Sequence, residues 1–261
     1  MFCDIIVVVN FMIDTHSHLF DEAFSSDLDE CIKRCKDNDV NKIILVGFSK
    51  ENNHVAQELA KKYDLFYPTA GIHPENVLDL DDDMAYLEDF IKNNKVYAVG
   101  ECGLDYHWRD DNKTLQKAEF RAQIELSIKY DLPLIIHSRD AIQDTYDILK
   151  EYKNVRGVMH CYSGSYEMAL EFIKLGLYIG FDGPLTFKNS KEPKKILCEI
   201  PEDRILIETD CPYLTPEPFR GKRNESAYVK YVLYEVARLR NISIEEAERI
   251  TSENACRLFG I

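Results

Sequence analysis

The sequence predicts an α/β fold of the TIM type, a (β/α)8 barrel formed as a single domain. Its 261 residues match the roughly 250 residues that one such barrel commonly needs. Short apolar runs rich in β-branched residues recur along the chain, with helical stretches between them. No repeat, linker or low-complexity tract divides the chain. Eight such alternations favour a closed barrel over an open sheet.

The expected strands are short and apolar, as is typical of parallel strands that helices and barrel core bury on both faces. In chain order they are Met12–Thr15, Lys42–Gly47, Phe66–Gly71, Val96–Gly100, Leu134–His137, Gly157–His160, Leu177–Gly180 and Arg204–Ile207.

Helices are expected between the strands. An apolar stripe at helical spacing covers residues 168–173 and ends at Gly176, a residue type that commonly follows a helix C-terminus. Ser243 and Glu246 form a capping box for a late helix. Residues 118–128 alternate with the period of a strand, but their length and their Glu, Lys, Gln and Arg content favour a helix. That helix would present a second apolar stripe to a neighbour outside the barrel.

The charge balance limits the classes of partner. The chain carries 46 acidic and 32 basic residues, a net charge of −14 at pH 7. Proteins that coat nucleic acid usually carry the opposite charge, because their affinity comes largely from neutralising phosphates. Broad coating of a duplex is therefore excluded. A small anionic substrate or the end of a strand remains open, held by a local basic pocket.

We expect a cytoplasmic protein without membrane association, and the sequence predicts no protein partner. No stretch approaches the ~20 apolar residues of a membrane span. The apolar run Ile5–Val9 is too short for a secretory signal. Residues 1–11 are expected to be a dispensable extension, with Met1 and Met12 both open as start sites, and residues 12–261 to form the barrel. The eight cysteines are expected to be reduced thiols.

Metal-ligating residue types occur at the ends of five expected strands. His16 and His18 lie two apart on the first strand, so both imidazoles can face one point. Barrel enzymes place their active sites at the carboxyl ends of the strands, where a lone histidine would more often be structural. Four imidazoles and two carboxylates suit two divalent metal ions that share a carboxylate. The candidate ligands are His16, His18, Glu101, His137, His160 and Asp210.

Other residues near these strand ends are candidates for substrate contacts. Arg139 lies two residues beyond His137 and can contact a phosphate in bidentate fashion. His73 ends the third strand, where a structural turn is the alternative reading. Arg220, Lys222 and Arg223 form the densest basic cluster, for which a solvated loop is the alternative.

Three further features have weaker readings. Glu208 shares the strand phase of Asp210 and can orient a ligand. The segment 106–108, Tyr-His-Trp, can stack a base or simply pack its loop. Cys31 and Cys35, four residues apart, have a metal clip as a minor alternative to buried thiols.

The chain resembles the TatD family of metal-dependent deoxyribonucleases. The resemblance covers nearly everything after Met12, whereas residues 1–11 have no counterpart in the usual start. It is carried by DTHSHL (14–19), GIHPE (71–75), VGECGLDY (99–106), LPLIIHSRDA (132–141), MHCYSG (159–164), ETDCPYL (208–214) and RGKRNE (220–225).

The resemblance implies the same six ligands, with Glu101 bridging two ions, and hydrolysis of DNA phosphodiesters, often as a 3′–5′ exonuclease. In this reading Glu101 and Asp210 are catalytic, and Asp210 accepts the proton of the attacking water. Mixed His and carboxylate ligands allow Mg, Mn, Zn or Fe. One alternative is an amidohydrolase that cuts a C–N or ester bond on the same metals. Another is a catalytically retired barrel that serves as a binding scaffold.

Overall fold

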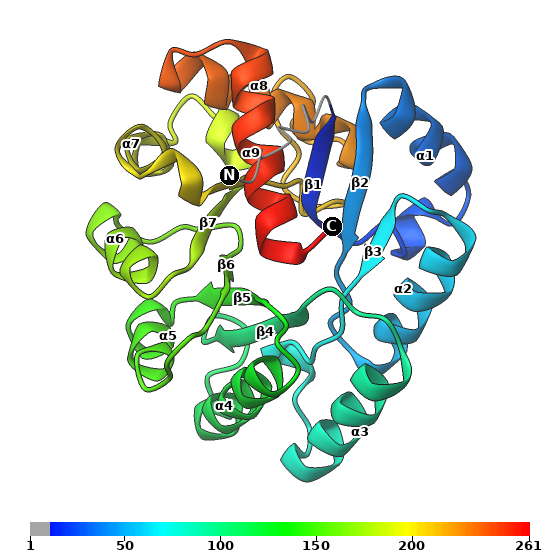
Figure 1. Cartoon of the computed structure of the whole chain (residues 1–261), viewed down its shortest axis with the longest axis vertical. Coiled ribbons are helices and arrows are strands. Elements are labelled where there is room, and N and C mark those ends of the chain that lie inside the picture. Colours follow the sequence, from blue (N-terminus) through cyan, green and yellow to red (C-terminus); the bar gives the residue numbers. More distant parts are fainter. Residues whose placement is uncertain (1–10) are drawn as a thin grey trace, which may run out of the picture.

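The fold is an α/β barrel of the TIM type, shown by a computed structural model that describes residues 11–261 (Figure 1). Parallel strands form the centre and helices surround them. The strands are β1 (Met12–Ser17), β2 (Val40–Leu45), β3 (Phe66–Pro68), β4 (Val99–Asp105), β5 (Leu134–Arg139), β6 (Gly157–Met159), β7 (Tyr178–Phe181) and β8 (Ile205–Ile207).

The strands pair in sequence order, and two seams join the ends of the paired sets. β1 to β3 form one set and β4 to β8 the other, all parallel. Between β3 and β4, the Gly100 N–H donates to the Ala70 carbonyl at 2.9 Å. Between β8 and β1, the His18 N–H donates to the Cys211 carbonyl at 3.0 Å. The strand order and these contacts bring the carboxyl ends of all the strands to one rim.

Two apolar cores hold the barrel. The larger lies between the strands and the surrounding helices. The smaller contains inward-facing strand residues such as Ile13, Ile135 and Leu206, together with Leu258 and Phe259. These last two belong to the final helix, which contacts β1 and β8 and lies across the barrel in Figure 1.

The helices are α1 (Leu28–Asp37), α2 (Lys50–Lys62), α3 (Leu80–Asn93), α4 (Lys113–Lys129), α5 (Ile142–Leu149), α6 (Tyr166–Lys174), α7 (Lys191–Glu199), α8 (Val229–Arg240) and α9 (Ile244–Phe259). Within the residues described, no helix is both long and apolar enough to cross a membrane. Every described cysteine is a free thiol.

Most predicted elements are confirmed, including the ambiguous segment 118–128, which lies within α4 and packs against both β4 and α3. Ser243 caps α9 by accepting the Glu246 N–H, and Gly176 adopts a φ of +96° just after α6. The expected boundary of the fourth strand was wrong, because β4 continues to Asp105 and contains Glu101. The predicted strand stopped at the end of the apolar run, although Cys102 and Leu104 beyond it are buried in the larger core.

The expected N-terminal extension, residues 1–11, lies almost entirely outside the described residues. At its end, the Phe11 carbonyl accepts a hydrogen bond of 2.8 Å from the Ser252 hydroxyl of α9. The division of the chain at residue 12 stays a prediction.

Candidate metal centre

The structure brings the six predicted ligands together at the carboxyl rim of the barrel. Three of them lie within strands, His16 on β1, Glu101 on β4 and His137 on β5. The other three follow strand ends, His18 after β1, His160 after β6 and Asp210 after β8. Residues almost 200 positions apart in the chain therefore face one point, because the parallel strands end at one rim.

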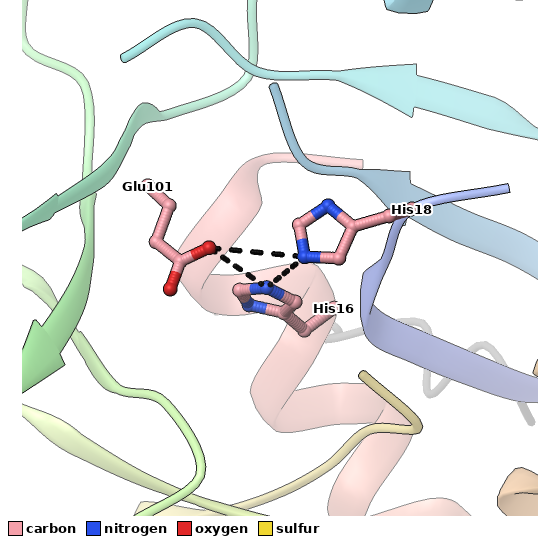
Figure 2. A group of neighbouring side chains, drawn as sticks. All are labelled: His16, His18 and Glu101. Atoms are coloured by element: carbon pink, nitrogen blue, oxygen red, sulfur yellow. Dashed lines mark hydrogen bonds and ion pairs between the residues drawn. The ribbon is translucent and has the colours of Figure 1, made fainter. Parts of the chain in front are cut away.

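His16 and His18 form one side of the centre (Figure 2). Their Nε2 atoms lie 3.1 Å apart. The Glu101 Oε2 atom is 3.4 Å from His16 Nε2 and 3.8 Å from His18 Nε2. Asp210 approaches the same two nitrogens with its Oδ1 atom, at 3.6 and 3.4 Å respectively. Two nitrogens and two carboxylate oxygens thus converge where a cation would contact all four.

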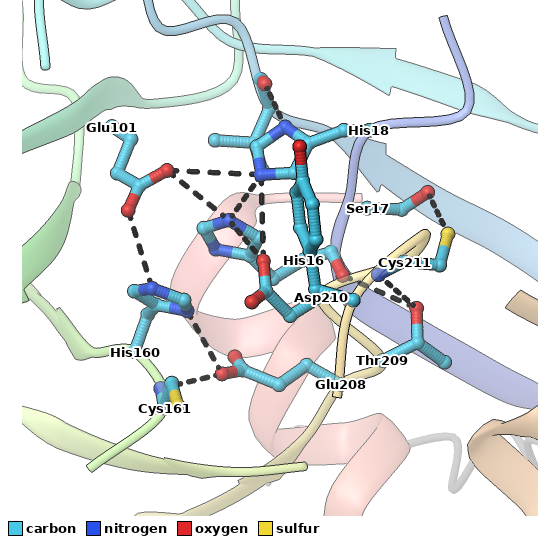
Figure 3. Close-up of polar contacts among 12 residues, drawn as sticks. His16, Ser17, His18, Glu101, His160, Cys161, Glu208, Thr209, Asp210 and Cys211 are labelled. Carbon is cyan, nitrogen blue, oxygen red and sulfur yellow. Dashed lines mark hydrogen bonds and ion pairs between the residues drawn. The ribbon is translucent and has the colours of Figure 1, made fainter. Parts of the chain in front are cut away.

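Glu101 connects this side to a second one. Its other oxygen, Oε1, lies 3.1 Å from His137 Nδ1 and 3.2 Å from His160 Nε2. Figure 3 shows Glu101 between His160 and the His16–His18 pair. One carboxylate therefore faces two separate pairs of imidazoles, the arrangement that a bridging ligand between two ions requires.

Three imidazoles are held from behind by oxygen acceptors. His18 Nδ1 lies 2.8 Å from the Val46 carbonyl, and His160 Nδ1 lies 3.1 Å from Glu208 Oε1. His137 Nε2 lies 2.9 Å from Asp105 Oδ2. An acceptor on the far nitrogen fixes the tautomer and turns the lone pair of the other nitrogen towards the centre. Histidines that ligate metals in proteins show this pattern, and sequence reasoning missed the contact between Asp105 and His137.

The charges at the centre also fit a bound cation. Although burial opposes both shifts, the surrounding imidazoles lower the pKa of Glu101 well below its ordinary value. The same Glu101, together with Glu208, raises the pKa of His160 well above its ordinary value. The buried Nδ1 atom of His16 has no hydrogen-bond partner among residues 11–261. The cluster therefore stabilises positive charge, and its nitrogen and oxygen donors suit divalent transition metals.

His73 also reaches the centre, with its Nε2 atom 3.7 Å from Glu101 Oε1. Its Nδ1 atom accepts the Glu75 N–H at 3.2 Å, so the proton of the neutral ring is on Nε2. Burial lowers the pKa of His73 to about 3, which keeps the ring neutral. Although His73, Glu101 and His137 lie close enough to share an ion, His73 presents an N–H donor there instead of a lone pair.

A pocket of about 530 Å³ opens above the centre, within the ~300–1,000 Å³ usual for small-molecule sites. Arg139 and His73 line it, as do two exposed aromatic residues, Trp108 (63% exposed) and Tyr213 (57% exposed). The Arg139 guanidinium lies 5.3 Å from the centre of the Trp108 ring. The sequence placed both residues near the rim, and the structure puts them in one pocket.

The predicted basic cluster does not line this pocket. Arg223 forms a bidentate ion pair with Asp27, with both N–O distances at 2.7 Å. Arg220 lies 4.3 Å above the Phe187 ring, and Lys222 lies 5.6 Å from the Phe219 ring. The structure thus separates these three side chains from the metal centre and from Arg139.

Two buried carboxyl groups behind the rim were also missed. Asp14 accepts hydrogen bonds from the Thr209 N–H at 2.9 Å and the Thr209 hydroxyl at 2.6 Å, which ties β1 to the loop that carries Asp210. Burial raises the pKa of Asp14 to about 7 and that of Asp182 to about 8. Each lies close in sequence to a strand end, the one signal that could have identified them.

Comparison with known proteins agrees with this geometry. The family model described as TatD related DNase matches residues 13–260. YabD of Bacillus subtilis, named an uncharacterized metal-dependent hydrolase, is 49% identical over 253 residues, which cover 96% of this chain and 99% of that protein.

Solved structures are similar over the same length. The crystal structure of YjjV, a TatD homolog from Escherichia coli, has a TM-score of 0.90 and 30% identity, covering 97% of this chain and 99% of that one. A TatD family hydrolase from Entamoeba histolytica has a TM-score of 0.82 and 26% identity, covering 95% and 98%. The chain therefore belongs to the TatD-related family of metal-dependent hydrolases.

Proposed function

We propose that this hydrolase cleaves phosphodiester bonds of DNA, working from strand ends. The observation that carries the proposal is Arg139, a guanidinium braced on Trp108 in the wall of the pocket above the metal centre. Guanidinium groups match the geometry of phosphate oxygens and bind them in bidentate fashion. In a chain with a net charge of −14, a cation at this position favours an anionic substrate over a neutral amide.

The proposal assigns the centre two divalent ions. His16, His18 and Asp210 would hold one, His137 and His160 the other, and Glu101 would bridge them. Such ions activate the attacking water and neutralise charge on the phosphoryl oxygens.

The chain's own residues supply the remaining chemistry. The neighbouring imidazoles of His18, His160 and His16 lower the pKa of Asp210 despite its burial, so the carboxylate is ionised and can accept a proton from water. The His73 N–H and the Arg139 guanidinium are donors for the oxygens that gain charge during in-line attack. All six ligands are present, which argues against a barrel that has lost its catalytic function.

The choice of strand ends follows from the shape and charge of the rim. Trp108 and Tyr213 expose their rings beside the pocket, and unpaired bases stack on such rings. The acidic chain cannot neutralise a long run of phosphates. Arg220 and Lys222 would then contact only nucleotides beyond the pocket, and Arg223 would act mainly by holding its loop through Asp27.

The test is hydrolysis of DNA by the metal-free protein after addition of Mg²⁺, Mn²⁺, Zn²⁺ or Fe²⁺ in separate reactions. We expect mononucleotides from linear single-stranded DNA and much slower cleavage of a circular single strand of the same sequence. Strands blocked at the 3′ or the 5′ end reveal the polarity. Efficient hydrolysis of amides or lactones, with linear DNA left intact under every metal, would replace this proposal with an amidohydrolase function.

A further inference from the structure

The segment that carries His73 leaves the sheet before it reaches the metal centre. Its last backbone pairing with β4 joins the Ala70 carbonyl to the Gly100 N–H at 2.9 Å. The next two residues, Gly71 and Ile72, are buried. Buried backbone N–H and C=O groups are costly when they stay unpaired, so these two residues need partners other than a neighbouring strand.

Two amide side chains supply these partners. Asn53, on α2, donates from Nδ2 to the Gly71 carbonyl at 3.1 Å, and its Oδ1 atom accepts the Gly71 N–H at 3.3 Å. Gln123, on α4, donates from Nε2 to the Ile72 carbonyl at 2.9 Å and accepts the Ile72 N–H at 3.0 Å. Both amides are 0% exposed. An amide carries a donor and an acceptor side by side, as a peptide group does. Gly71 and Ile72 are thus held between two backbone brackets, the Asn53 and Gln123 amides.

The bracketed segment lies directly against the backbone of Glu101. A Cβ added to Gly71 would be 2.6 Å from the Gly100 Cα atom and 2.8 Å from the Glu101 carbonyl oxygen. His73 follows two residues after Gly71, and its backbone N–H donates to the Phe48 carbonyl at 2.9 Å. Its Nε2 atom is the one that lies 3.7 Å from Glu101 Oε1. A shift of the segment would therefore move the His73 ring relative to the metal centre.

The proposed reaction makes the position of this ring important. A donor stabilises an oxygen that gains charge only when it is already aimed at that oxygen. A misplacement of about 1 Å, caused by a change far from the chemistry, can lower a rate by about 10²-fold. The brackets fix the backbone immediately before His73 from two helices, which is the support that such a donor requires.

We propose that Gln123 and Asn53 are positioning residues that hold the His73 N–H in place for its role as a donor to the substrate. This proposal rests on the proposed phosphodiesterase function. Neither amide lines the pocket above the metal centre, so both act through the backbone of residues 71 and 72 and take no part in bond cleavage.

The test is a double-mutant cycle on the Mn²⁺-loaded enzyme with bis(p-nitrophenyl) phosphate as substrate. Gln123→Met keeps the approximate size of the side chain and removes both hydrogen bonds. We expect this variant to lower kcat about tenfold and to leave KM within about twofold, because the donor acts on charge that develops in the transition state. In a His73→Ala background, the same substitution should lower kcat less than about twofold.

Two more variants separate positioning from general damage. Asn53→Leu, a change of similar size, removes the other bracket and should show the same dependence on His73. Gln57→Met is the matched control, because Gln57 lies on α2 and its amide oxygen has no hydrogen-bond partner among residues 11–261. Its kcat should stay within about twofold of the wild type. If both bracket variants lose as much activity without His73 as with it, the amides only stabilise the fold and the proposal is overturned.

Hydrogen exchange of the metal-free protein reports on the brackets without a substrate. Mass spectrometry of peptides that contain residues 69–77 follows the amides of this segment. Exchange should be about tenfold faster in Gln123→Met and in Asn53→Leu than in the wild type, and unchanged in Gln57→Met. Unchanged exchange in both bracket variants would also contradict the proposal.

This proposal and the proposed function fail in different ways. If the enzyme hydrolyses a lactone but no phosphodiester, and the cycle measured with the lactone depends on His73 as expected, the brackets stand and the proposed function falls. If the phosphodiester is hydrolysed, but Gln123→Met lowers kcat equally with and without His73, the proposed function stands and the brackets fall.

Discussion

Replacing Asp105 with Asn tests whether the hydrogen bond behind His137 prepares that ring to bind a metal. The ionised Asp105 carboxylate accepts the His137 Nε2–H at 2.9 Å, which leaves Nδ1 free towards Glu101. Although burial opposes ionisation, hydrogen bonds from His137 and from the Trp108 and His107 N–H groups lower the pKa of Asp105 to about 2. The acceptor is therefore a charged carboxylate at any pH at which the protein would work.

The amide of Asp105→Asn cannot reproduce this arrangement at low cost. Asp105 Oδ1 accepts the His107 N–H at 2.8 Å and the Trp108 N–H at 2.9 Å. If the amide oxygen keeps these two bonds, the amide NH2 faces His137 and moves the ring proton to Nδ1, the nitrogen that faces the centre. If the amide flips, both backbone donors lose their acceptor.

The expected effect follows from one charge-assisted hydrogen bond. Such a bond contributes ~1.5–3 kcal/mol, which corresponds to about 10–100-fold in affinity. Outer hydrogen-bond partners of metal ligands elsewhere show the same range, ~10–100-fold. Calorimetric titration of the metal-free protein with Zn²⁺ or Mn²⁺ measures the effect without a substrate. Asp110→Asn, an exposed carboxylate on the same loop, is the matched control. If Asp105→Asn binds metal within about twofold of the control and keeps its melting temperature, Asp105 does not prepare His137 for metal binding.

Three further predictions follow from the geometry. Arg139→Ala should lower kcat/KM for DNA by about 10–100-fold and leave the metal content unchanged. The control Arg121→Ala, on α4, should leave kcat/KM unchanged. Loss of metal from Arg139→Ala would contradict a role in phosphate binding. The raised pKa of His160 indicates that the metal-free centre holds a proton in place of a cation. Metal binding should therefore release protons, and metal affinity should fall as the pH falls. Calorimetric titrations in buffers of different ionisation enthalpy measure the number of protons released. Glu119 is 1% exposed, and burial raises its pKa from an ordinary 4.5 to about 8. The stability that the protonated Glu119 side chain contributes is complete below pH 4.5 and is lost as the pH rises towards 8. Glu119→Gln should therefore increase the free energy of unfolding at pH 9, measured by urea titration, by about 1–3 kcal/mol. The control Glu125→Gln, at an exposed position of the same helix, should change this free energy little.

The sequence alone predicted the barrel and placed the six candidate ligands at strand ends. Alternation of strands and helices is a local property, readable from apolar periodicity. Side chains at the carboxyl ends of parallel strands must share one rim once the barrel closes. His16 and His18 share a face because strand side chains alternate with a period of two. The fourth strand was placed too early, because its buried residues Cys102 and Leu104 alternate with Glu101, Gly103 and Asp105 and so form no apolar run.

Which polar groups pair depends on the tertiary structure and cannot be read from local pattern. Asp105 contacts His137 across 32 positions of sequence, and Glu208 contacts His160 across 48. Such pairs depend on which strands are neighbours and on their register, which periodicity within one segment does not encode. Arg223 illustrates the same limit: it belonged to a basic cluster in the sequence, but α1 and the loop before it bring Asp27 to its guanidinium from 196 residues away. Local pattern specifies which face of an element is buried, whereas the partner of a charge is set by long-range packing.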